Sequence, residues 1–91
     1  MTTPAEHDTP ADRAAKIKEV TCRVLEIDES ELGADTLFQE DLDADSMKLI
    51  ELLASLEIEY DVEIDEDALD RMVNLAGVYA VINEAIDARE G

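Results

Sequence analysis

The sequence has very little of several residue types that define whole classes of protein. Its one cysteine, Cys22, cannot form an internal disulfide, and its one histidine, His7, lies in a polar N-terminal stretch away from the helical patterns. A Ser-His catalytic pair is therefore not expected. Aromatic residues make up only 3% of the chain, so the core must be mainly aliphatic. No stretch resembles a signal peptide or a membrane span, and we expect a cytoplasmic protein.

Basic residues are equally scarce. The chain holds 7 Lys and Arg against 25 Asp and Glu, which gives a formal net charge of -18. Nucleic acids and anionic membranes both bind through basic protein surfaces, so neither is an expected partner. The composition instead predicts a partner protein with a basic surface.

The length of 91 residues is enough for one small domain with one core. Residues 1–9 are polar, hold one of the two prolines and show no apolar period, so we expect a mobile tail there. The predicted domain covers residues 10–88, and residues 89–91 form the C-terminal end.

The first periodic segment runs from Pro10 to Ile27 and predicts a helix, with Thr9 as a candidate N-cap. Its apolar residues recur at helical spacing on one face: Ile17, Val20, Val24 and Ile27. Cys22 stands beside this face, and we expect a partly buried thiol with no reactive role.

A long connection follows over residues 28–45, rich in acids and poor in apolar residues. Connections of this length in small domains are often functional. The apolar residues expected to hold it against the core are Leu32, Leu37, Phe38 and Leu42.

The segment after Ser46 predicts a second helix with two apolar faces. At about 100° per residue, one face gathers Leu49, Leu52, Leu53, Leu56 and Tyr60, and we expect it to face the core. The other apolar residues form a second stripe that begins beside Ser46: Met47, Ile50, Ala54 and Ile58. Glu51 and Glu57 border the second stripe, so we expect it to dock onto an apolar groove rimmed by Arg and Lys. A wider buried face is the alternative.

The rest of the chain predicts a short helix and a final helix. The short helix is expected between Glu66 and Met72, where acids at its start suit the helix dipole. Asn74 is the predicted N-cap of the last helix. Gly77 lies in the first turns of that helix and should make them less stable by about 1 kcal/mol than Ala would. The expected fold is all-α, a small bundle of three main helices and one short helix, with a long loop between the first and second helices.

Ser46 itself can be explained in two ways. The free N–H groups and the positive end of the dipole at a helix N-terminus favour an attached phosphate. The simpler explanation is that Ser46, or Asp45 before it, only caps the helix. A calcium loop begun at Asp41 fails because Ser46 and Leu52 stand where Gly and Glu are needed, and no zinc spacing is present, so no metal site is expected.

The stretch DLDADSMKLIELLASLEIEYDVEID resembles the attachment motif of acyl carrier proteins, and the likeness covers roughly Ala11 to Ala88. The resemblance implies that a phosphopantetheinyl transferase moves 4'-phosphopantetheine from coenzyme A onto Ser46. The arm then holds an acyl group as a thioester, and the chain itself catalyses nothing. Asp45 is implied to help present Ser46 to the transferase and its magnesium ion.

The resemblance also implies a partner surface, formed by Met47, Ile50, Glu51, Ala54 and Glu57 on the second helix and by Ile64 near the arm at the short helix. The implied partners are an acyltransferase, a ketosynthase or similar acyl-processing enzymes with basic docking surfaces. We expect a monomer and a free-standing, type II carrier.

The chain departs from the family pattern at four positions. Asp43 stands where Gly is usual and removes a flexible backbone position, Met47 replaces Leu, Asp65 replaces Pro, and Asn74 replaces Thr. These departures favour a carrier of a polyketide or related specialised pathway over one for housekeeping fatty-acid synthesis. Two alternatives remain: an aminoacyl or peptidyl carrier, and an acidic interaction module that never carries an arm.

Overall fold

The structure is a computed structural model, and it describes residues 10–90. The tail predicted over residues 1–9, with Thr9 and His7, lies outside the described residues. Within the described range every regular element is helical: α1 (Pro10–Leu25), η2 (Glu29–Glu31), α2 (Ser46–Tyr60), η3 (Glu66–Arg71) and α3 (Leu75–Glu90). The predicted all-α fold is confirmed, with three main helices and η3 as the short helix. The short 3-10 helix η2 was not predicted.

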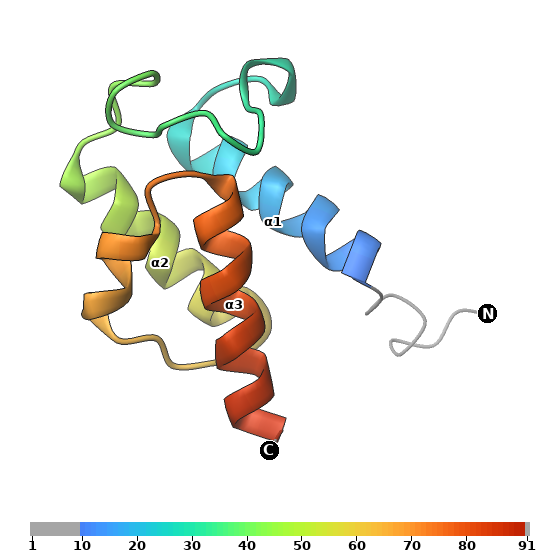
Figure 1. Cartoon of the computed structure of the whole chain (residues 1–91). Coiled ribbons are helices and arrows are strands. Elements are labelled where there is room, and N and C mark those ends of the chain that lie inside the picture. The colour runs from blue at the N-terminus through green and yellow to red at the C-terminus, as the bar shows by residue number, and fades with distance from the viewer. Residues whose placement is uncertain (1–9, 91) are drawn as a thin grey trace.

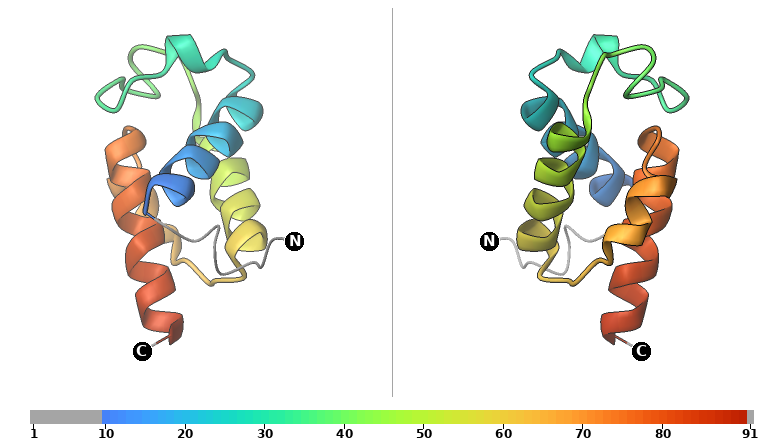
Figure 2. Two further views of the ribbon diagram at one scale, coloured as in Figure 1. Left: turned by 90° about the vertical axis from the view of Figure 1, so that its right-hand side faces the viewer. Right: turned by 90° about the vertical axis from the view of Figure 1, so that its left-hand side faces the viewer.

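The helices form a small bundle in which α2 and α3 are bridged from two sides (Figure 1). α1 packs against both α2 and α3, and η3 also contacts both of them. The long connection between α1 and α2 lies over the end of the bundle where α2 and α3 begin (Figure 2). The start of α2 is therefore held by the loop as well as by the bundle.

The core is aliphatic, as the composition indicates. The predicted inner face of α2 is buried at Leu49, Leu52, Leu53 and Leu56, while Tyr60 is half-buried. The loop contributes Leu32 and Phe38, both buried, and Leu42 packs partly against the core. Leu37 is half-buried and does not belong to this core cluster. Cys22 is buried rather than partly buried, and desolvation together with the charge of Glu29 raises the pKa of its thiol.

The first helix ends two residues earlier than its apolar pattern predicts. It stops at Leu25 because Glu26 adopts the left-handed conformation, with φ 61°, and the Ile27 N–H donates to the Cys22 carbonyl at 3.0 Å. This six-to-one hydrogen bond is the Schellman ending of a helix. α2 ends in the same way, with Asp61 at φ 53° and the Val62 N–H bonded to the Glu57 carbonyl. Asp61 and Val62 end the second helix, as the sequence predicts. Glycine usually occupies the left-handed position, so its absence at Glu26 hid the end of α1.

Gly77 has a different role from the one predicted. Asn74 caps α3 as expected, since its side-chain oxygen accepts from the Gly77 N–H at 2.9 Å. A Cβ atom on Gly77, however, would stand 2.0 Å from the carbonyl oxygen of Arg71 at the end of η3. The expectation that Ala would suit this position better is therefore wrong, because only glycine lets η3 and α3 approach this closely.

Candidate functional site

Ser46 is the first residue of α2, and its side chain is exposed. The helix is capped by Asp45, whose Oδ1 accepts from the Lys48 N–H at 3.0 Å. Within residues 10–90, no hydrogen bond from the Ser46 hydroxyl is found. The cap predicted at Ser46 or Asp45 is thus supplied by Asp45, which leaves the serine oxygen open to solvent at the helix N-terminus.

The loop before Ser46 holds this helix start in place. The buried Ala44 donates its N–H to the Phe38 carbonyl at 2.9 Å, and the Phe38 N–H donates to the Val73 carbonyl at 2.9 Å. Between them Asp43 has φ 60°, a conformation that glycine adopts without steric cost. Asp43 therefore adopts, at some steric cost, a conformation that glycine would adopt freely.

Lys48 is the only base between Val24 and Asp70, a stretch with 18 acids. Its ammonium group lies 2.9 Å from a Glu26 carboxylate oxygen and 3.9 Å from one of Glu51. The hydrogen bond and the opposite charge lower the pKa of Glu26 and raise the pKa of Lys48. This exposed pair links the first turn of α2 to the end of α1, a contact that the sequence pattern did not predict.

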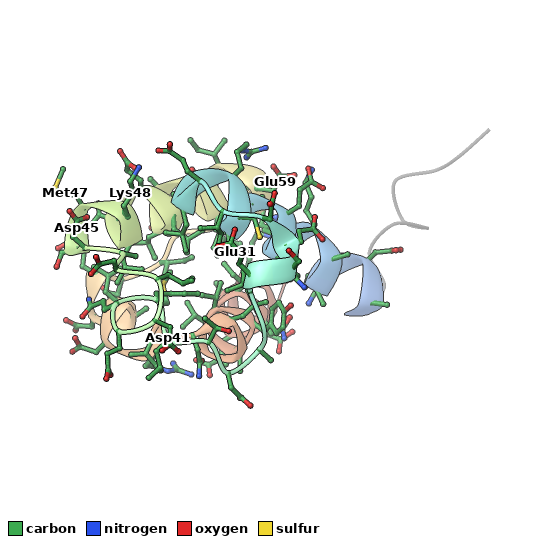
Figure 3. The ribbon with its side chains drawn as sticks, turned by 90° about the horizontal axis from the view of Figure 1, so that it is seen from above. Glu31, Asp41, Asp45, Met47, Lys48 and Glu59 are labelled. Atoms are coloured by element: carbon green, nitrogen blue, oxygen red, sulfur yellow. The ribbon has the colours of Figure 1, made fainter. Side chains whose placement is uncertain are left out.

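The second stripe of α2 lies on the surface. Met47 is 65% exposed, Ile50 41% and Ile58 83%, and Ala54 is also exposed. Figure 3 shows Met47 beside Asp45 at the outer end of α2, with its side chain directed away from the bundle. The alternative of a wider buried face is therefore wrong for these residues.

The other predicted contact residues lie at different points along α2. Glu51 is exposed near the helix start, close to Lys48. Glu57 is half-buried, and its Oε2 accepts from the Ile64 N–H at 2.8 Å. Ile64 thus lies beside Glu57. Glu57 is eleven positions after Ser46, so it stands about 16 Å farther along the helix axis at 1.5 Å per residue. The role of Glu57 in holding the chain before η3 was not predicted, because no periodic pattern shows such a contact.

A cavity of about 200 Å³ opens between the loop, the first turns of α2 and the end of η3. Leu49, three residues after Ser46, forms part of its wall. The full lining is Leu37, Gln39, Glu40, Leu49, Leu69, Asp70 and Val73. Its residues come from three separate segments, so sequence reasoning did not find it. Among the described residues, no group of three or more His, Cys, Asp or Glu side chains is arranged to hold a metal ion.

Comparison with known proteins agrees with this geometry. A family model described as "Phosphopantetheine attachment site" matches residues 15–82, a span that includes Ser46. Polyketide-8 synthase acyl carrier protein 1 of Streptomyces avermitilis is 53% identical over 82% of this chain and 89% of its own length. The chain belongs to the acyl carrier protein family.

Two further relatives extend the comparison. An acyl carrier protein of Petrotoga mobilis is 32% identical over 79% of this chain and 85% of its own length. A chain in a solved structure titled "The ishigamide ketosynthase/chain length factor" is 32% identical, with a TM-score of 0.71, covering 84% of this chain and 96% of that one. The prosthetic group of this family is phosphopantetheine.

In the described part of the chain, no helix is long and apolar enough to cross a membrane.

Proposed function

We propose that Ser46 carries 4'-phosphopantetheine and that the chain presents acyl intermediates of polyketide-type biosynthesis as thioesters on this arm. The observation that supports the proposal most is the free, exposed Ser46 hydroxyl at an N-terminus already capped by Asp45. The relatives from Streptomyces avermitilis are named as polyketide synthase acyl carrier proteins, which favours this cargo class. Because those relatives are acyl carriers by name, an aminoacyl or peptidyl cargo has less support.

The attachment step forms one phosphodiester bond. The Ser46 Oγ attacks the phosphorus that bears the pantetheine in coenzyme A and passes its proton to a base of the transferase. The bond from this phosphorus to the bridging oxygen of the pyrophosphate breaks, and 3',5'-adenosine bisphosphate departs with that oxygen. The bound arm supplies a terminal thiol that holds the acyl group as a thioester. The N-terminus of α2 favours the added negative charge through its dipole and free N–H groups. Asp45 uses Oδ1 as the helix cap, which leaves Oδ2 to face the magnesium ion of a transferase.

The proposed partner surface is the second stripe of α2 with its acidic neighbours. Met47, Ile50 and Ala54 supply apolar contact, and Glu51 supplies a charge for a basic rim. Glu57 and Ile64 extend this surface to the far end of α2. The structural neighbour is named for a ketosynthase/chain length factor, which supports a ketosynthase-type partner. A phosphopantetheinyl transferase and an acyltransferase are proposed because they would attach the arm and load it. We also propose that the chain is monomeric and cytoplasmic and catalyses no reaction itself.

Mass spectrometry of the intact protein tests the attachment. Incubation with coenzyme A, magnesium and a broad-specificity transferase should add one phosphopantetheine to the wild type and none to Ser46→Ala. Ser30→Ala is the matched control, because Ser30 is an exposed serine outside the α2 start, and it should gain the same mass as the wild type. A mass gain on Ser46→Ala would contradict the assignment.

A further inference from the structure

Ile58 is 83% exposed, more than any other large hydrophobic residue in the described part of the chain. It is absent from the core and from the residues packed against the core. A β-branched residue is also a poorer helix former than Leu, Lys or Glu. Neither packing nor helix propensity therefore explains an isoleucine at this position.

The neighbours of Ile58 direct its side chain away from the bundle. On one side Glu57 binds the Ile64 N–H before η3, and on the other side Glu59 lies 3.7 Å from the Lys16 ammonium of α1. Residues 57 and 59 stand about 100° to either side of Ile58 on the helix. The isoleucine thus points outward between the two elements that flank α2.

Ile58 also lies in line with Met47 at the other end of the helix. The two residues are eleven positions apart, so they point within about 20° of each other and stand about 16 Å apart along the axis. Ala54 lies between them in nearly the same direction, and its short side chain leaves a low point in the second stripe. Glu51 stands between them along the axis and about 40° to one side of Met47.

We propose that Ile58 is a second apolar anchor for the partner enzyme, at a set distance from the first anchor, Met47. The fitting partner is a ketosynthase-type enzyme with two apolar hollows about 16 Å apart and an Arg or Lys between them to meet Glu51. Three acidic residues near Ile58 are exposed, namely Glu59, Asp61 and Glu63. Their negative charge supports a partner with basic residues around its apolar hollow. This inference rests on the proposed function and adds to it an anchoring role for Ile58 and a spacing between two anchors.

The test measures acyl transfer from the phosphopantetheine-loaded protein to a purified ketosynthase–chain length factor pair that accepts cargo from the wild type. Ile58→Ser should raise KM for the carrier on the order of tenfold and leave kcat unchanged, because the lost contact is made equally in the ground and transition states. Ile58→Leu keeps an apolar side chain and should stay within about twofold of the wild-type KM. Serine and isoleucine have similar helix propensities, so melting temperatures should match.

A double variant tests the two-anchor geometry. Met47→Ser should also raise KM, and because the two sites are more than about 10 Å apart, the fold-changes should multiply in the double variant. Intact mass first verifies full phosphopantetheine loading of every protein. A wild type that cannot be loaded would overturn the proposed function, whereas full loading with an unchanged KM for Ile58→Ser would overturn only the anchor. An equal rise in KM for leucine and serine would also overturn the apolar contact.

Discussion

Replacing Gly77 by Ala sets two physical effects against each other. Helix propensity alone predicts that Gly77→Ala stabilises the protein by about 1 kcal/mol. In the structure the new Cβ would lie 2.0 Å from the Arg71 carbonyl oxygen and 3.1 Å from the carbonyl carbon. Because the obstacle is backbone, η3 must move away from α3 by about 1.4 Å, from 2.0 Å to 3.4 Å, to reach ordinary contact distance. Overpacking of this kind costs typically 1–3 kcal/mol, and a backbone obstacle places the cost near the upper end of about 3 kcal/mol.

The net expectation for Gly77→Ala is a loss of about 2 kcal/mol, which lowers the melting temperature of a domain of this size by roughly 8–16 °C. Thermal unfolding followed by circular dichroism at 222 nm measures the change. Gly33→Ala is the matched control, since its Cβ would meet only the Thr36 Oγ1 at 3.4 Å and the φ of Gly33 is not positive. The control should be neutral or slightly stabilising, by up to about 1 kcal/mol. A Gly77→Ala protein that melts at or above the wild-type temperature would refute the close approach of η3 to α3.

Four further substitutions have expected outcomes. Asp43→Gly should raise the melting temperature by several degrees, because the residue has φ 60° and relief of that strain gives about 1 kcal/mol; a fall would argue against the left-handed loop. Leu53→Asp should unfold the domain, whereas Ile50→Asp should leave helical content unchanged in circular dichroism; equal damage would mean that Ile50 is core. Arg71 holds the pKa of Glu84 below its usual value, so this pair stabilises the fold above that usual pKa and the effect is lost as pH falls through the lowered one. The melting temperatures of wild type and Glu84→Gln should therefore converge on acidification, and a constant difference between pH 7 and pH 3 would contradict this.

The sequence predicted those parts of the fold that depend on local periodicity. The two faces of α2 followed from the spacing of its leucines, and the cap at Asn74 followed from residue type and position. The sequence left two candidates for the N-cap of α2, Ser46 and Asp45. The hydrogen bond from the Lys48 N–H identifies Asp45 as the cap.

What the sequence did not predict depends on contacts between distant segments. Gly77 was judged by helix propensity, because nothing in its own helix indicates that Arg71 lies against it. The Lys48–Glu26 pair joins residues 22 positions apart. Glu26 has the left-handed conformation, and no residue type in the sequence indicates this. For the same reason the sequence did not predict the cavity wall or the hydrogen bond that holds Ile64 to Glu57.

The hydrogen bonds that join the long loop to the start of α3 bear on how cargo can travel. The Phe38 N–H is bonded to the Val73 carbonyl, and the Ala76 N–H is bonded to the Ala34 carbonyl at 3.3 Å. Because the buried Phe38 lies between these segments, we expect the loop around it to open only when the core around Phe38 opens. We therefore expect Ser46 to be held in place with the bundle. The reach needed to deliver a cargo from one enzyme to the next must come from the length of the attached arm, and the protein acts as its fixed pivot.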